Sequence, residues 1–136
     1  MVRRSFLNNI KRLLGLVAVV PLADACSSSE VNPKPTANFT IDITNPAYSS
    51  LLVVGGVVNV QGIFIVRESQ STYVGLSHVC THAGCTVNFS SSSKQFVCPC
   101  HGGVYDIYGR VVSGPPPSPL AQYQVSLTGN MLTVTG

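Results

Sequence analysis

Short runs of apolar and β-branched residues alternate with polar turns from residue 39 to the end of the chain. Such runs, separated by turns rich in Gly, Ser and Asn, are typical of antiparallel β-structure. No segment of this region has a convincing helical period, and no internal repeat is visible. The pattern predicts strands at residues 39–43, 57–60, 63–68, 73–77, 86–89, 95–97, 104–105, 110–112, 122–127 and 131–134.

The turns between these strands fit the same interpretation. Gly129 and Asn130 have the composition of a two-residue hairpin turn, and the serine-rich run at 90–94 has that of a hairpin tip. We therefore expect residues 39–136 to form an all-β domain, a small antiparallel β-barrel or sandwich.

The first 26 residues follow a different order: basic, then apolar, then small. Arg3 and Arg4 precede an apolar run at 13–22, and this order resembles a twin-arginine export signal. Ten residues cover only about 15 Å as a helix, half of a hydrocarbon core of roughly 30 Å. The run therefore predicts an exported protein, located in the bacterial cell envelope on the periplasmic side.

Cys26 follows the small residues directly, at a position that resembles a bacterial lipoprotein junction. We expect a lipid on Cys26, which would anchor the protein to the membrane. Two alternatives remain: simple cleavage after Ala25, leaving a free thiol, and an uncleaved short anchor. Residues 27–38, which are polar and contain two prolines, are expected to form a tether.

Charge and composition exclude some classes of protein. The chain has 136 residues, 45% of them hydrophobic and only 10% charged, which suits one packed domain rather than a disordered chain. Its net charge of +3 comes from the signal region, because residues 27–136 contain four Lys and Arg against four Asp and Glu, 4 minus 4 giving zero. A domain with no net charge argues against a nucleic-acid surface, which needs clustered positive charge.

Two short segments contain the residues best suited to bind a metal. Cys80 and His82 have Cys-x-His spacing, Cys98 and His101 have Cys-x-x-His spacing, and fifteen residues separate His82 from Cys98. Each segment also contains one further cysteine, Cys85 or Cys100. Glycines follow both histidines, at Gly84, Gly102 and Gly103. Two Cys and two His suit tetrahedral zinc, and they also form the ligand set of one kind of [2Fe-2S] centre.

These segments resemble the two cluster-binding loops of the Rieske family. The resemblance implies a [2Fe-2S] cluster with Cys80 and Cys98 on one iron and His82 and His101 on the other. It also implies a Cys85–Cys100 disulfide and a Tyr105 hydroxyl directed at a ligand sulfur. A proline-bearing loop would cover the cluster, at the run Gly114-Pro115-Pro116-Pro117. His78 is expected to be a packing or surface residue, because the ligand set is complete without it.

The resemblance implies an electron carrier with no catalytic constellation of its own. Its partner would be another redox protein or a quinol–cytochrome complex. The alternatives are the iron–sulfur subunit of a quinol–cytochrome c oxidoreductase, the small subunit of an arsenite-oxidase-like enzyme, and a zinc-stabilised binding lipoprotein. Ala83 stands where quinol-oxidising members typically have Leu, which weighs against docking into a quinol site. Gly103 stands where they typically have Ser, so a lower potential than theirs is expected. Tyr105, donating to sulfur, would raise it.

Overall fold

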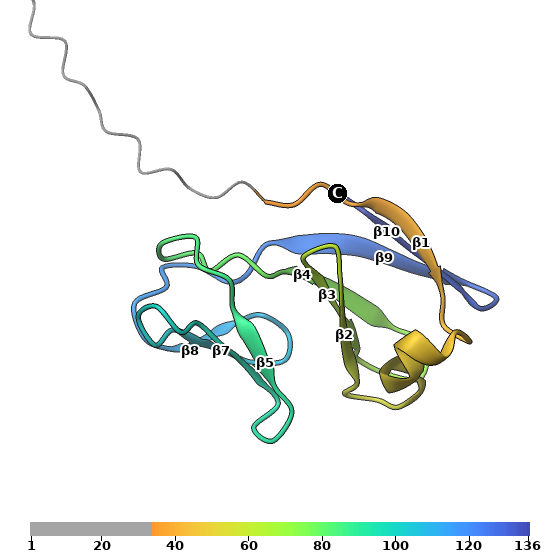
Figure 1. Ribbon diagram of the computed structural model, residues 1–136, viewed down its shortest axis with the longest axis horizontal. Coiled ribbons are helices and arrows are strands. Elements are labelled where there is room, and N and C mark those ends of the chain that lie inside the picture. The colour runs from red at the N-terminus through yellow and green to blue at the C-terminus, as the bar shows by residue number, and fades with distance from the viewer. Residues whose placement is uncertain (1–33) are drawn as a thin grey trace, which may run out of the picture.

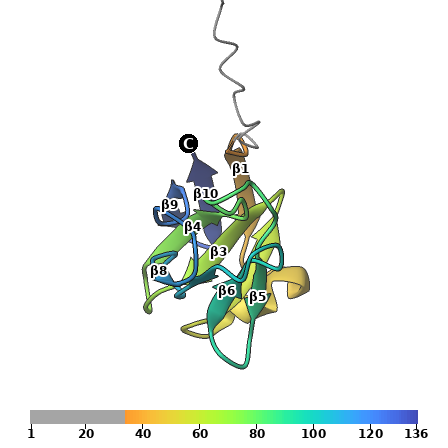
Figure 2. The same ribbon diagram turned by 90° about the vertical axis from the view of Figure 1, so that its left-hand side faces the viewer.

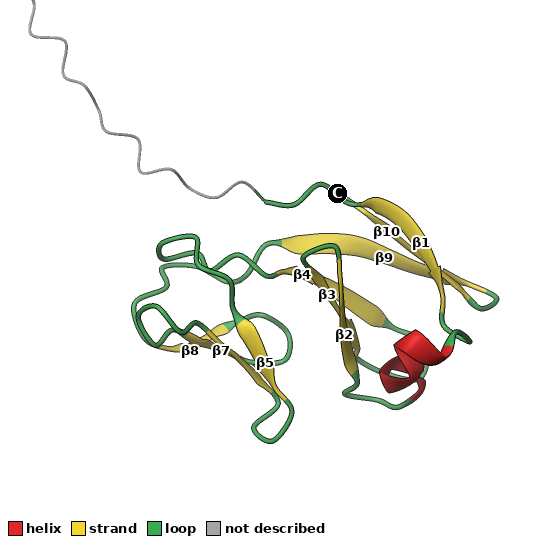
Figure 3. Ribbon diagram, in the orientation of Figure 1, coloured by secondary structure: helices red, strands yellow, loops and turns green. Residues whose placement is uncertain are grey.

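The chain folds into two antiparallel sheets and one short 3-10 helix within residues 34–136, the part that this computed structural model describes (Figures 1 and 3). This architecture confirms the all-β prediction. The expected export signal at 1–26, the lipid site at Cys26 and the first part of the tether, 27–33, lie outside the described residues. Within residues 34–136, no helix is long and apolar enough to cross a membrane.

The larger sheet contains six strands, and two of its hairpins have two-residue turns. Gly129 and Asn130 form the predicted two-residue turn, with Gly129 at φ 60°. Gln61 and Gly62 form a second one, and both take positive φ, as the right-handed twist of a tight hairpin requires. The strand order is β1 (Asn38–Asp42), β10 (Met131–Thr135), β9 (Gln122–Thr128), β4 (Tyr73–Ser77), β3 (Ile63–Arg67) and β2 (Val57–Val60).

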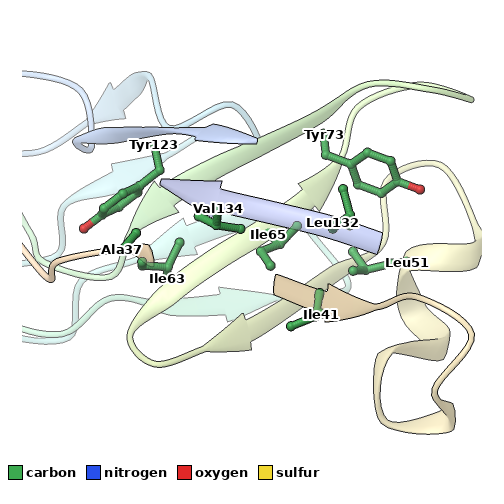
Figure 4. Close-up of a cluster of buried hydrophobic side chains, with 9 residues drawn as sticks. All are labelled: Ala37, Ile41, Leu51, Ile63, Ile65, Tyr73, Tyr123, Leu132 and Val134. Atoms are coloured by element: carbon green, nitrogen blue, oxygen red, sulfur yellow. The ribbon is translucent and has the colours of Figure 1, made fainter. Parts of the chain in front are cut away.

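β3 separates two hydrophobic cores. Successive strand side chains point to opposite faces of a sheet, so a strand buried on both faces is apolar at every position. Ile63 and Ile65 face the first core, between the strands of the larger sheet and the helix. Figure 4 shows the buried residues of that core: Ala37, Ile41, Leu51, Ile63, Ile65, Tyr73, Tyr123, Leu132 and Val134. Phe64 and Val66 face the second core, which lies beneath the smaller sheet.

The smaller sheet contains β5 (Asn88–Ser90), β6 (Gln95–Val97), β7 (Val104–Tyr105) and β8 (Val111–Ser113). It occupies the left of Figure 1, and Figure 2 views the molecule from that side. Phe96 in β6 joins this sheet to the larger one, because its ring lies 4.7 Å from that of Phe64 in β3. Within the smaller sheet, it lies 5.2 Å from the ring of Phe89. Cys80 and Cys98, which lie in the segments that follow β4 and β6, are buried in this second core.

The sequence did not predict the 3-10 helix η1 (Pro46–Leu52). The Asn45 side chain accepts a hydrogen bond from Ala47 N–H, and Pro46 occupies the first turn, where its missing N–H costs nothing. A seven-residue helix with non-helical dihedrals at Tyr48 is too short and irregular to produce a hydrophobic period. The Asn-Pro pair was the only local signal for it.

Six of the strands begin or end one or two residues from the expected positions, and two of the shifted starts have a local reason. β5 begins at Asn88 instead of residue 86, because Thr86 pairs with Val79 in an isolated bridge before the hairpin starts. β8 begins at Val111 instead of residue 110, since Arg110 belongs to a turn in which its N–H donates to Asp106.

The described end of the expected tether is bound to the domain. Lys34 Nζ donates to the carbonyl of Gln122 at 3.1 Å, and the Tyr123 hydroxyl donates to the carbonyl of Pro35 at 2.5 Å. Ala37 is buried and exchanges two backbone hydrogen bonds of 3.0 Å with Gly136. Residues 34–38 therefore extend the edge of the larger sheet, on the side of the domain where the C-terminus lies (Figure 1).

Candidate metal centre

The two Cys/His segments form two loops of the same backbone design, the first loop at residues 80–85 and the second loop at 98–103. In each, the carbonyl of the leading Cys accepts from the N–H four residues later, at 2.9 Å and 3.1 Å respectively. Its own N–H donates to the carbonyl five residues later, at 2.8 Å and 2.7 Å. Gly84 and Gly102 occupy the fifth position with φ of 77° and 71°, a conformation that favours glycine.

Of the two free cysteines, Cys80 and Cys98, Cys80 has the better stabilised thiolate form. Its side chain is buried, and burial alone would raise its pKa. Hydrogen bonds from the Tyr105 hydroxyl, the His82 backbone, the Cys98 side chain and the Ala83 backbone outweigh that effect, and the net pKa is lowered. The first loop therefore provides donors for a thiolate at Cys80.

The pKa of Cys98 shifts in the opposite direction, upward. Burial raises its pKa, the neighbouring Cys80 raises it further, and backbone hydrogen bonds from Cys100 and His101 compensate only in part. The two buried thiols thus hold one negative charge more readily than two. Metal cations between them would stabilise both thiolates, because a coordinating thiol is deprotonated outright.

The two histidines lie on the solvent side of the loops. His82 and His101 are both exposed, their Nδ1 atoms are 3.2 Å apart, and their rings are nearly perpendicular at 89°. Two nitrogens at about 2.0–2.1 Å from one tetrahedral metal ion would be roughly 3.3 Å apart. The spacing of the imidazoles therefore suits two ligands on one metal.

The four donors do not converge on a single point. Within the described residues, the one group of three or more ligand-type residues with donor atoms within 4.8 Å of one another is Cys85, Cys98 and Cys100. Two of these three form the disulfide, so they are not available as ligands. One zinc ion needs all four donors within about 4 Å of each other. A buried pair of thiols and an exposed pair of imidazoles instead match a group with two metal ions.

A disulfide and a third loop hold the two loops together. Cys85 and Cys100 form the disulfide that the resemblance implies, joining the first loop to the second. Pro116, in the proline run 114–117, is buried, and its Cγ would lie 2.6 Å from a Cβ atom on Gly103. The proline run therefore packs directly on the second loop.

Tyr105 and His78 have different surroundings. The Tyr105 hydroxyl is buried 3.3 Å from Cys80 Sγ. His78 is half-buried, and its ring packs over the turn at Gly62, where an added Cβ would meet ring atoms at 2.9 Å. His78, which follows β4, thus packs against the β2–β3 turn.

Sequence reasoning missed Thr81 and Ser118. The Thr81 hydroxyl lies 3.1 Å from the Tyr105 oxygen and donates to the Ser118 carbonyl at 2.6 Å. The two residues are 37 positions apart, and one of the interacting groups is a backbone carbonyl, so no local pattern indicates the contact.

Comparisons with known proteins agree with this geometry. The profile of the Rieske [2Fe-2S] domain family matches residues 23–124. The cytochrome b6-f complex iron–sulfur subunit of Chlorobaculum thiosulfatiphilum is 39% identical over 71 residues, 52% of this chain and 39% of that protein. The corresponding subunit of Synechococcus elongatus is 44% identical over 82 residues, 55% of this chain and 46% of that one.

A solved structure leads to the same family. The crystal structure of the plasma membrane Rieske protein of Synechocystis PCC 6803 matches with a TM-score of 0.52 and 31% identity, covering 59% of this chain and 84% of that one. The chain belongs to the Rieske [2Fe-2S] family, and its cofactor is a [2Fe-2S] cluster. It spans about half or less of the length of the curated relatives.

Proposed function

We propose that this protein carries single electrons, with Cys80 and Cys98 as ligands of one iron of the cluster and His82 and His101 as ligands of the other. The arrangement of the donors in two pairs, one buried and one exposed, supports this assignment. When bound, the cluster accepts and returns one electron. Neutral imidazoles make it less negative than an all-thiolate cluster, which raises its potential.

The buried cysteines and the exposed histidines would have different roles in such a carrier. Burial of Cys80 and Cys98 excludes water from the sulfur ligands. The exposed edges of His82 and His101 bring the other ligands to the surface, where a redox partner can approach closely. Because the role proposed for these loops is electron transfer alone, we assign the substrate chemistry to the partner.

A membrane cytochrome complex is the partner that we favour. The curated relatives are iron–sulfur subunits of cytochrome b6-f complexes, and the similar solved structure is a plasma membrane Rieske protein. The matched part covers only about half of those subunits, so the partnership is inferred from the domain alone. No observation favours an arsenite-oxidase-like partner in the same way.

For the location, we propose the bacterial cell envelope, with Cys26 lipidated. The proposal rests on Arg3 and Arg4, the short apolar run and the position of Cys26. Replacing both arginines with Lys should leave the protein in the cytoplasm. Mass spectrometry of the mature chain should find acyl groups on Cys26 at residue one, whereas an unmodified Cys26 at the mature N-terminus would contradict lipidation and a retained Met1 would favour an anchor.

A potentiometric titration tests the electron-carrier role. The cluster-loaded protein should titrate reversibly with a one-electron slope, at a potential between about −150 and +300 mV. The reduced protein should then pass its electron to an oxidised c-type cytochrome in stopped-flow mixing. A loaded protein that shows no reversible wave in this range would contradict the proposed role.

A further inference from the structure

The hydroxyl of Tyr105 is surrounded by three polar atoms. Cys80 Sγ lies 3.3 Å away, and the backbone nitrogen and side-chain oxygen of Thr81 each lie 3.1 Å away. The Tyr105 side chain is fully buried, so water does not supply further partners. The distribution of protons among these atoms therefore follows from the groups themselves.

The two protons of Thr81, on its hydroxyl and on its backbone nitrogen, each have one acceptor. The Ser118 carbonyl can only accept, so the one proton of the Thr81 hydroxyl is directed to it across 2.6 Å. The Thr81 N–H can only donate, and it points to the Tyr105 oxygen. The single Tyr105 proton is left with two acceptors, Thr81 Oγ1 and Cys80 Sγ.

We propose that Thr81 is a positioning residue that lowers the potential of the centre by competing with Cys80 Sγ for the Tyr105 proton. This inference rests on the proposed function, in which Cys80 is a thiolate ligand and carries no proton of its own. A hydrogen bond to that sulfur stabilises the reduced, more negative state. The more the Tyr105 hydroxyl donates to Thr81 Oγ1, the weaker its hydrogen bond to Cys80 Sγ becomes.

The competition also connects the third loop to the ligand sulfur. Donation to Ser118 polarises the Thr81 hydroxyl and makes its oxygen a better acceptor. The carbonyl of Ser118 lies in an exposed stretch after the proline run, so its position sets how strongly Thr81 competes. Movement of this stretch would change the potential without touching a ligand.

The direct test compares Thr81→Val with Thr81→Ser in the cluster-loaded protein. Valine keeps the shape and the backbone N–H but removes the competing oxygen. Its reduction equilibrium constant should rise about threefold to tenfold, or roughly 30–60 mV at 59 mV per tenfold change for one electron. Serine keeps the hydroxyl and should titrate close to the wild type. A potential that is unchanged or lower in Thr81→Val would overturn the proposal.

A second pair of variants separates this role from a structural one. In the Tyr105→Phe background there is no proton to compete for, so adding Thr81→Val should leave the potential unchanged. A shift of the same size in both backgrounds would mean that Thr81 acts by another route. Thr81→Ala serves as a replacement if Thr81→Val loads poorly; failure of both to load, while Thr81→Ser loads, would show that the hydroxyl holds the loop and would contradict the proposal.

Iron and sulfide content is measured before each titration. A wild-type protein without a cluster would contradict the proposed function itself. A loaded wild type with a normal one-electron wave, and no response to Thr81→Val, would contradict only the role of Thr81.

Discussion

Pro116 packs so closely on Gly103 that a Cβ atom at residue 103 would lie 2.6 Å from its Cγ and 3.0 Å from its Cδ. From the sequence, Gly103 was noted as a loop glycine and as a missing hydroxyl, where quinol-oxidising relatives typically carry Ser. The structure gives glycine a steric reason at this position. A serine at 103 would add a hydroxyl and also displace the proline run, so the resulting potential would report both changes.

The first prediction concerns this contact. Gly103→Ala should lower the free energy of unfolding by about 1–3 kcal/mol, because Pro116 must move away from the new methyl group. Denaturant unfolding of the cluster-loaded protein measures the change. The matched control combines it with Pro116→Ala. Because the clash is then relieved, the double variant should lose less unfolding free energy than the sum of the losses in the two single variants. Simple additivity would contradict the account.

A second prediction concerns pH. Burial would raise the pKa of Asp106, but hydrogen bonds from the backbone and side chain of Arg110 and the backbone of Tyr108 hold it below 3.8. A lowered folded-state pKa means stability that is fully present above the unfolded value and is lost as the pH falls through the folded value. Asp106→Ala should therefore cost about 1–2 kcal/mol at pH 7, discounted because the side chain is 26% exposed.

Unfolding at a series of pH values measures the effect. The difference between the wild type and Asp106→Ala should shrink as the pH drops below about 4. Glu68→Gln is the control, because Glu68 is an exposed carboxylate in another turn. A difference that stays constant down to low pH would mean that the turn, and not the charge, provides the stability.

The third prediction concerns the disulfide. Cys85 and Cys100 close a segment with a sequence separation of 15. The chain-entropy description of such a crosslink gives about 3 kcal/mol. The Cys85→Ser/Cys100→Ser double variant should lose about that much stability to denaturant, and reduced wild type should converge on the same value. A double variant as stable as the oxidised wild type would contradict a stabilising role.

The fourth prediction concerns the ligands. Alanine at Cys80, His82, Cys98 or His101 should remove the visible absorption of the cluster and its iron, because each change leaves one iron a ligand short. His78→Ala is the control and should keep both, since the His78 ring packs over Gly62 instead. Far-ultraviolet circular dichroism verifies that each variant is folded. Cluster loss in His78→Ala, or full retention in any of the four ligand variants, would contradict the assignment.

Local patterns explain what could be predicted from the sequence. The strands were visible because β-branched runs and turn residues recur at short range, and Gly129-Asn130 formed the expected hairpin. The Cys and His residues were visible because ligands that share a loop must lie two or three residues apart. The short 3-10 helix had no such period, so it was missed.

Long-range contacts explain what could not be predicted. The steric role of Gly103 depends on Pro116, and the polar contact of Thr81 depends on a backbone carbonyl 37 residues away. The division of the donors into a buried pair and an exposed pair also needs coordinates, because Cys-x-His spacing alone suits zinc as well as iron. These contacts are the ones that tune the centre, and they arise only when the three loops are brought together.

Metal and sulfide analysis of the wild-type protein, purified anaerobically, tests the central claim most directly. We expect two iron atoms and two acid-labile sulfides per chain, with an electron paramagnetic resonance signal that appears on reduction by one electron. Stoichiometric zinc with no labile sulfide would contradict the account.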